Sequence, residues 1–457
     1  MTSPSTATPS AGLPGAADDD APAEQPIPTR SWIARVSRRD DPWFITARAA
    51  RNRPLVQLLA LAMIPNEDSA SYGVDKAERA RQSWLDAHGD DDLDDEQLLA
   101  LLTDVVRTAM SDVESAPLTM GITAGFDSRP LLHVLRRLGY EPELHTYGQP
   151  GNIDWDVITW LGDRLGAPVT MIDTTTLPFS LETYEKLASR GNASQIGAGG
   201  HASRFMDTIH PVRVNVHGFL NDVLTGDNRE KTAEAVGDDR SAFIGRNNQF
   251  AFQQFMEPSL VQRLVPTAGI DEARSLDVYR QYDLAYRQYS RIKPGWATDP
   301  RRLVYPFEDE RWMGYWLSRP LEQRTGQSRW FRFVQSLDSP IFADLEGLEG
   351  EGKRLRINRK WRFYGHKGTP GIIDLSALGI VPQHEPAFPF CTFALAHNNP
   401  SFRAVLDESL KRVRGRRIFR SSFLETVEQK FWAGDVSASK MINGVITADI
   451  QSEVGRV

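Results

Sequence analysis

The chain has 457 residues and a formal net charge of −7 at pH 7, with 40% hydrophobic and 25% charged residues. This composition is typical of a globular protein with about two or three units, and its acidic balance gives no reason to expect a nucleic-acid partner. The one cysteine, Cys391, cannot form an internal disulfide, which favours a reducing compartment. The N-terminus lacks a signal sequence, and the longest apolar run, residues 55–64, is about half of a membrane span. We therefore expect a cytoplasmic protein with no membrane partner.

Composition and periodicity divide the chain into four segments. Residues 1–30 are small, polar and rich in proline, and we expect a disordered tail. Residues 31–92 contain short apolar stretches of a small N-terminal unit, whose type the pattern does not specify; the run at 55–64 is a buried helix or strand. Residues 93–370 carry the main domain, and residues 371–457 are expected to form a mainly helical extension.

The main domain begins with an acidic run that leads into a helix. Asp94 and Gln97 have the spacing of a capping box. Apolar residues then recur at helical spacing, at Leu98, Leu101, Leu102, Val105 and Ala109. Acidic side chains are favourable beside the unpaired N–H groups of a helix start, so we interpret the aspartates as a helix N-terminus rather than a metal site.

After this helix the sequence alternates between strand and helix patterns. Strands are expected around residues 118–122, 143–148, 168–173 and 212–216, with helical stretches between them. This order predicts an α/β fold with a doubly wound, mostly parallel sheet. In such sheets, ligands bind beyond the carboxyl ends of the strands.

The loop after the first expected strand carries the clearest chemistry. It reads Thr123-Ala124-Gly125-Phe126-Asp127-Ser128. A strand, a tight loop of small residues and a helix N-terminus together form an anion site, because the backbone N–H groups and the helix dipole favour negative charge. The Ser128 hydroxyl can donate to phosphate, but Asp127 would repel phosphate unless a divalent cation lies between them. The loop therefore predicts a ligand such as Mg-ATP.

These six residues resemble the pyrophosphate loop, Ser-Gly-Gly-x-Asp-Ser, of the ATP pyrophosphatase (PP-loop) superfamily. The stretch VNVHGFLNDVLTGDN, after the fourth expected strand, resembles the second motif of its asparagine synthetase-type members, with Gly218 and Asp222 at the first glycine and the aspartate. The resemblance implies that residues 93–370 form an asparagine synthetase-like domain with the adenine nucleotide alpha hydrolase-like fold. A weaker match falls on a mostly structural segment of the family, at Pro306, Phe307, Asp309 and Pro320.

By this resemblance, the two aspartates bind the metal. Asp127 and Asp222 would hold Mg²⁺ against the pyrophosphate of ATP, as the aspartates of the two motifs do in the family. The remaining nucleotide-binding positions belong to the same two loops, at Thr123, Ala124, Gly125, Phe126, Ser128 and Gly218.

The resemblance also implies positions for the base and for a catalytic lysine. Tyr147 and Gly148, at the end of the second expected strand, would border the adenine. A lysine would stabilise the charge that develops during adenylation or acyl transfer; Lys353 is the first candidate and Lys360 the second. The implied activity is an AMP-forming ligase that uses ATP and Mg²⁺, adenylates a small-molecule or peptide carboxylate, and transfers the acyl group to ammonia or an amine.

Two departures from the family limit this activity. Glutamine-dependent members have a cysteine after Met1, where this chain has Thr2, and too few residues precede the first loop for a glutaminase domain. Nitrogen would come from ammonia, a substrate amine or a separate amidotransferase. Phe219 occupies the position of the family's glutamate and cannot accept a proton, and Val223 replaces an acid. Two alternatives remain: the same fold adenylating another oxygen nucleophile, or a degenerate, non-catalytic nucleotide-binding protein.

Overall fold

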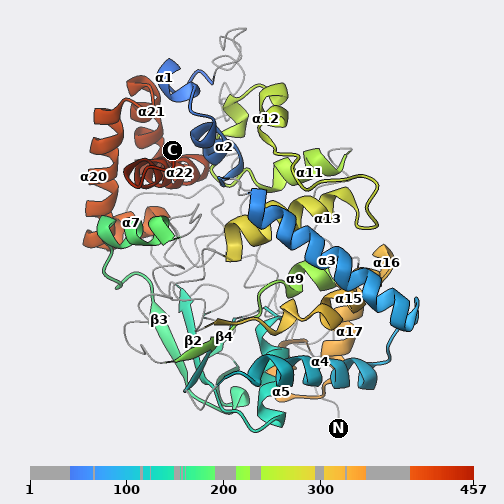
Figure 1. Cartoon of the computed structure of the whole chain (residues 1–457). Helices are drawn as coiled ribbons and strands as arrows, with labels where there is room; N and C mark the ends of the chain where they lie inside the picture. Colours follow the sequence, from blue (N-terminus) through green and yellow to red (C-terminus); the bar gives the residue numbers. More distant parts are fainter. Residues whose placement is uncertain are drawn as a thin grey trace, which may run out of the picture. The chain divides into compact units, whose positions relative to one another are not determined.

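The structure is a computed structural model that places twelve segments of the chain (Figure 1). It describes residues 42–64, 67–113, 117–123, 125–148, 155, 158–159, 161–190, 213–226, 238–293, 303–324, 327–345 and 392–457. The expected tail at residues 1–30 lies outside these segments. The predicted boundaries at 92/93 and 370/371 stay predictions, and the part from Asp40 to Val457 forms one compact unit.

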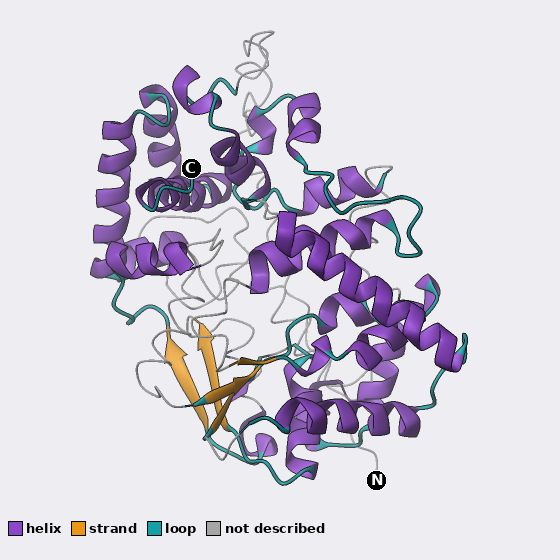
Figure 2. Ribbon diagram, viewed as in Figure 1, coloured by secondary structure: helices purple, strands orange, loops and turns teal. Residues whose placement is uncertain are grey.

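A five-stranded, all-parallel sheet carries the loops that the sequence singles out (Figure 2). Its strands are β1 (Leu118–Gly121), β2 (Glu143–Gly148), β3 (Val169–Asp173), β4 (Val214–Val216) and β5 (Leu303–Val304), in the order β3-β2-β1-β4-β5. Met120 of β1 pairs with Leu144 on one side and with Val216 on the other. The predicted α/β fold with a parallel sheet is therefore confirmed.

The order of the strands fixes where the chain changes direction. From β1 it moves outward through β2 to β3, and it then returns to the other side of β1 to place β4 and β5. The gap between β1 and β4 is thus the point at which the winding reverses. In open α/β sheets, the loops that leave the two strands at such a point diverge and leave a crevice for a ligand.

Five helices pack into the same hydrophobic core as this part of the sheet. They are α4 (Asp95–Met110), α5 (Ser128–Arg137), α9 (Asn221–Thr225), α15 (Glu310–Ser318) and α17 (Ser328–Ser336). Trp312, Trp316 and Trp330 are fully buried between them and contact one another edge to face, with ring centroids 5.8–6.1 Å apart. Aromatic pairs of this geometry add stability beyond the area that they bury.

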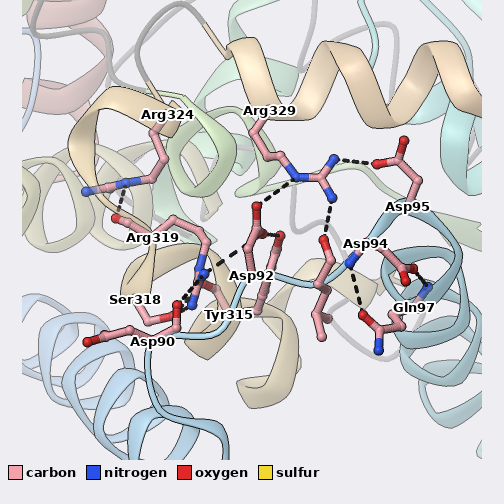
Figure 3. Close-up of polar contacts among 11 residues, drawn as sticks. Asp90, Asp92, Asp94, Asp95, Gln97, Tyr315, Ser318, Arg319, Arg324 and Arg329 are labelled. Atoms are coloured by element: carbon pink, nitrogen blue, oxygen red, sulfur yellow. Dashed lines mark hydrogen bonds and ion pairs between the residues drawn. The ribbon is translucent and has the colours of Figure 1, made fainter.

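The acidic run before α4 is a structural element, as the sequence predicts. Asp94 accepts a hydrogen bond from the Gln97 backbone at 2.8 Å, and the Gln97 side chain accepts one from the Asp94 backbone at 3.0 Å, which confirms the capping box. The neighbouring aspartates contact two buried arginines (Figure 3). Arg329 pairs with Asp92 and Asp95, and Arg319 lies 3.9 Å from Asp92. The Tyr315 hydroxyl donates to Asp92 Oδ1 at 2.7 Å. We call Asp92, Asp95, Tyr315, Arg319 and Arg329 the acid–arginine network.

A second group of helices joins the two ends of the described chain. These helices are α1 (Ala47–Ala50), α2 (Arg53–Leu61), α7 (Leu181–Arg190), α19 (Thr392–Asn398), α20 (Pro400–Arg416), α21 (Ser421–Trp432) and α22 (Val436–Glu453). The predicted buried run at 55–64 is the helix α2, and its apolar side chains share one cluster with those of α20 to α22. An isolated antiparallel bridge joins Ile45 to Phe419. The end of the chain is helical, as the sequence predicts.

The other described elements connect these layers. They are α3 (Glu67–His88), α11 (Asp239–Arg246), α12 (Pro258–Leu264), α13 (Val278–Tyr282), α16 (Leu321–Arg324), the 3-10 helices η2 (Gly162–Leu165), η4 (Gln253–Phe255), η7 (Pro306–Glu308) and η8 (Pro340–Leu345), and the π-helix η5 (Asp283–Ile292). Among the described helices, none combines the length and apolar character that crossing a membrane requires.

Candidate nucleotide and metal site

The two loops that the sequence singles out meet at the reversal point of the sheet. Asp127 follows β1 and is the N-cap residue of α5, and Asp222 follows β4 in the first turn of α9. Both aspartates are half-buried, and 95 residues separate them along the chain. We call Asp127, Ser128, Gly218, Asn221 and Asp222 the switch-point site.

Asn221 joins the two loops directly. Its side-chain amide donates to Asp127 Oδ1 at 2.8 Å, and its oxygen accepts a hydrogen bond from the indole N–H of Trp312 at 3.1 Å. Because an indole nitrogen can only donate, Trp312 determines that the amide nitrogen of Asn221 faces Asp127. The position of the Asp127 carboxylate is thus set by Asn221 of the second loop and by Trp312, which orients Asn221.

The electrostatics of the two aspartates favour a bound cation. Burial, followed by the nearby charge of Asp222, raises the pKa of Asp127 to about 7, against the hydrogen bond from Asn221, which lowers it. Burial also raises the pKa of Asp222, although Arg287 and Arg246 oppose this effect. Two neighbouring carboxylates repel each other, and either a proton or a cation between them relieves the repulsion.

The close approach of the loops depends on a glycine and on strained backbone. A Cβ on Gly218 would lie 3.2 Å from the backbone carbon and Cβ of Asp127, and 3.3 Å from the backbone nitrogen of Ser128. Leu220 has a φ of +80°, in the left-handed region that glycine favours. Such strain persists only where the surroundings impose it, and it concentrates at functional sites. Here it turns the chain sharply so that Asn221 and Asp222 face Asp127.

The first loop leaves polar groups available at the start of α5. Asp127 makes no side-chain cap of that helix. Ser128 is 8% exposed, and its hydroxyl has no partner within the described residues. Thr123 Oγ1 accepts a hydrogen bond from the Gly125 N–H at 3.1 Å, so these two residues fold the loop on itself. An unsatisfied buried hydroxyl beside an uncapped helix start is suited to an anionic ligand.

Some predicted positions lie elsewhere or outside the described residues. Phe126 points into the core, where its ring meets that of Phe331 edge to face at 5.5 Å. Tyr147 and Gly148 end β2, on the same edge of the sheet as the two loops. Three other predicted residues lie outside the described segments: Ala124, Lys353 and Lys360.

Arg129 is a structural support of the first loop that sequence reasoning missed. Its side chain is fully buried. It donates to the Gly125 carbonyl at 3.1 Å and to the Ile341 carbonyl at 2.8 Å, and its guanidinium lies 4.2 Å from the centre of the Phe126 ring. Arg129 therefore ties the loop to η8. A charged residue in the first turn of a helix gives no sequence signal of such burial.

Phe219 forms an apolar wall beside the switch-point site. It is 4% exposed and meets the rings of Tyr289 and Tyr305 at 6.0 and 5.3 Å. Lys293 Nζ lies 5.2 Å from the centres of both tyrosine rings and forms an ion pair with Glu308. Phe219 is thus part of an aromatic cluster.

A group of arginines lies near Asp222. Arg287 and Arg246 both act on the Asp222 carboxylate electrostatically. Burial, Arg287 and Arg246 lower the pKa of the fully buried Arg291 to about 9. We call Arg246, Arg287 and Arg291 the arginine cluster. The sequence shows only an Arg- and Tyr-rich helical stretch here, which is also typical of a solvated helix face.

This arrangement suits a magnesium ion whose ligands would be the two aspartates and a phosphate. Within the described residues, no group of three or more histidine, cysteine, aspartate and glutamate side chains gathers in a way that could hold a metal ion. Mg²⁺ is usually bound by one or two carboxylates together with substrate phosphates and water. The pair of Asp127 and Asp222, with the unpartnered Ser128 hydroxyl beside it, satisfies that requirement.

In the comparisons with known proteins, no protein-family model and no curated protein matches this chain.

Proposed function

We propose that this protein is a cytoplasmic, ATP-dependent ligase that forms AMP and pyrophosphate, adenylates a carboxylate, and passes the acyl group to ammonia or an amine. The observation that carries the proposal is the meeting of Asp127 and Asp222 at the carboxyl ends of β1 and β4. The likeness of their two loops to the motifs of asparagine synthetase-type enzymes gives the class of reaction.

In this proposal Asp127 and Asp222 hold Mg²⁺, which when bound screens the negative charge of the β- and γ-phosphates. The N-terminus of α5 and the Ser128 hydroxyl donate to the phosphate oxygens. Gly218 keeps the space above the Ser128 N–H free of side chain. Arg129 keeps the loop in one conformation, so that these donors are already oriented when the nucleotide binds.

The reaction then proceeds in two displacements. A carboxylate oxygen attacks the α-phosphorus of ATP, the bond from that phosphorus to the bridging oxygen breaks, and pyrophosphate leaves with the electron pair. The nitrogen of ammonia or an amine attacks the acyl carbon, AMP leaves, and the nitrogen loses a proton to a base. Phe219 cannot be that base, so a group of the substrate or a partner would accept the proton. A separate amidotransferase is one source of the ammonia.

The replacement of the family's glutamate and acid by Phe219 and Val223 favours two alternatives. One is a protein of the same fold that adenylates a different oxygen nucleophile. The other is a nucleotide-binding protein without catalysis. Both keep the switch-point site, and they differ from the ligase in the chemistry that takes place once the nucleotide is bound.

The test is Mg-ATP binding by calorimetry together with exchange of labelled pyrophosphate into ATP, measured with a panel of amino acids, dicarboxylates and peptides. We expect exchange with at least one carboxylate, and its loss in Asp127→Ala and Asp222→Ala. Asp94→Asn is the matched control, because it removes a carboxylate from another helix N-cap and keeps the cap. Mg-ATP binding that survives both alanine substitutions would contradict the proposal, and binding without exchange would favour the non-catalytic alternative.

A further inference from the structure

We propose that the arginine cluster is a second anion subsite, which holds the terminal phosphates of the nucleotide and the pyrophosphate that leaves. This inference rests on the proposed function, because it assigns a product site beside the same metal pair. The three side chains come from α11 and η5, two elements that sequence reasoning did not connect with the first loop. Helical segments with π-type hydrogen bonding are rare and frequently occur at functional sites.

The positions of two of these side chains are fixed by polar contacts. Arg287 pairs with Asp283 at 3.2 Å. Arg291, one helical turn further along η5, donates to Asn247 Oδ1 at 3.2 Å and to Gln249 Oε1. Because Asn247 directly follows Arg246, these contacts bring the end of α11 against η5. The guanidinium groups of Arg287 and Arg291 are thus held by the fold before any ligand binds.

The described residues balance the positive charge of this cluster incompletely. Its neighbouring carboxylates are Asp283 and Asp222, and the other partners of Arg291 are neutral amides, which orient a guanidinium but leave its charge. Arg246 Nε is buried and has no hydrogen-bond partner within the described segments. Burial and the charge of Arg287 lower the pKa of Arg246. Buried like charges are costly, and an anion placed among them removes that cost.

Counting charges favours a phosphate over a single carboxylate as that anion. Three arginines and three aspartates, Asp127, Asp222 and Asp283, cancel one another, so a bound Mg²⁺ leaves two positive charges over. The terminal phosphates of ATP carry about three negative charges at neutral pH, which matches this excess better than one carboxylate does. Guanidinium groups also bind phosphate oxygens in pairs, with two parallel hydrogen bonds.

The subsite has a defined place in the reaction. When the α-phosphorus accepts the substrate oxygen, the bond to the bridging oxygen breaks and its electron pair moves to the departing pyrophosphate. The arginine cluster, next to Asp222, stabilises the charge that grows there. It therefore acts on the leaving group. Tyr147 and Gly148, which are expected to border the adenine, lie at the end of β2, on the opposite side of β1 from β4 and Asp222.

The experiment measures binding of Mg-pyrophosphate to the full chain by calorimetry, with AMP and the exchange-active carboxylate as separate arms. Arg246→Met should weaken Mg-pyrophosphate about tenfold or more and leave AMP binding and the KM of the carboxylate unchanged. Arg246→Lys should recover part of the affinity. Arg107→Met, which removes an arginine that is 60% exposed, is the matched control, and thermal melting establishes that each variant is folded.

Two outcomes would overturn the subsite. One is a folded Arg246→Met protein that binds Mg-pyrophosphate as the wild type does, while Asp222→Ala abolishes binding. Pyrophosphate binding would then depend on the two aspartates and not on the arginine cluster. The other is an unchanged pyrophosphate affinity with a raised KM for the carboxylate, which would assign the arginines to that substrate. A wild-type protein that binds neither Mg-pyrophosphate nor Mg-ATP would overturn this inference and the proposed function together. Pyrophosphate binding that depends on Arg246 in a protein without exchange would support the subsite and contradict only the ligase.

Discussion

The acid–arginine network, and the switch-point site together with the neighbouring arginine cluster, are both built from aspartates and arginines, yet their charges are arranged in opposite ways. In the network, the arginines are buried and the carboxylates remain 39–41% exposed. Arg329 has two carboxylates and a backbone carbonyl as partners. In the switch-point site both aspartates are half-buried, and the charge that perturbs the pKa of Asp127 most is another carboxylate.

This difference distinguishes a structural polar cluster from a ligand site. The network satisfies its own groups, and it joins the segment before α4 to α15 and α17 (Figure 3). The switch-point site retains two repelling carboxylates, an unpartnered hydroxyl at Ser128 and a neighbouring arginine cluster. Groups left unsatisfied in this way cost stability in the free protein, and they become favourable when the missing charge is bound.

The largest expected effect on stability concerns the network. Arg329→Met removes the pairs with Asp92 and Asp95 and the hydrogen bond to the Leu93 carbonyl at 2.6 Å. We expect the free energy of unfolding in urea to fall by about 3 kcal/mol, with Mg-ATP affinity unchanged. Arg107→Met is the control, with an expected change of about 0.5 kcal/mol or less. A selective loss of Mg-ATP affinity in folded Arg329→Met would remove the distinction between the two clusters.

A smaller effect is expected from the pH dependence of the switch-point site. Because the pKa of Asp127 is raised from 3.8 to about 7 in the folded protein, the folded state binds this proton more tightly than the unfolded state does. Its contribution to stability is therefore present at low pH and is lost as pH rises from about 4 to about 7.

Asp127→Asn should remove this dependence, since an asparagine oxygen can still accept the hydrogen bond from Asn221. The variant should gain stability over the wild type as pH rises through that window. Urea unfolding at several pH values measures the difference. Adding Mg²⁺ should stabilise the wild type and leave the variant nearly unchanged. An equal pH profile for both proteins would show that neither burial nor the charge of Asp222 raises the pKa of Asp127.

The smallest effect separates two aspartates that occupy the same helical position. Asp94→Ala removes the cap of α4 and should cost about 1 kcal/mol, whereas Asp94→Asn should cost little. Asp127 makes no cap of α5, so Asp127→Ala should not destabilise the protein in the same way. Thermal melting of the three variants in the absence of Mg²⁺ compares them. A loss of stability in Asp127→Ala equal to that in Asp94→Ala would assign Asp127 a structural role.

The sequence predicts the scaffold because the signals involved are local. Alternating apolar residues predict β1 to β4, and the Asp94/Gln97 spacing predicts the start of α4. The position of Asp127 and Asp222 on one edge of the sheet follows from the strand pattern, since parallel strands end on the same side. The expected meeting of the two loops is therefore a consequence of topology.

The rest of the site depends on tertiary packing, which leaves no local pattern. Nothing in the sequence around Arg129 indicates that its guanidinium supports a loop from the core, and nothing around Asn221 indicates its contact with Trp312. The arginine cluster depends on contact between α11 and η5, about 40 residues apart. The candidates Lys353 and Lys360 stay predictions.

The contact between Trp312 and Asn221 has a consequence for observing this protein. The indole nitrogen is one amide away from the Asp127 carboxylate, through hydrogen bonds of 3.1 and 2.8 Å. Any event that changes the charge on that carboxylate alters the field at the ring. Trp312 thus gives the molecule an intrinsic fluorophore coupled to its proposed cation position, through which binding can be followed optically without a label or a turnover assay.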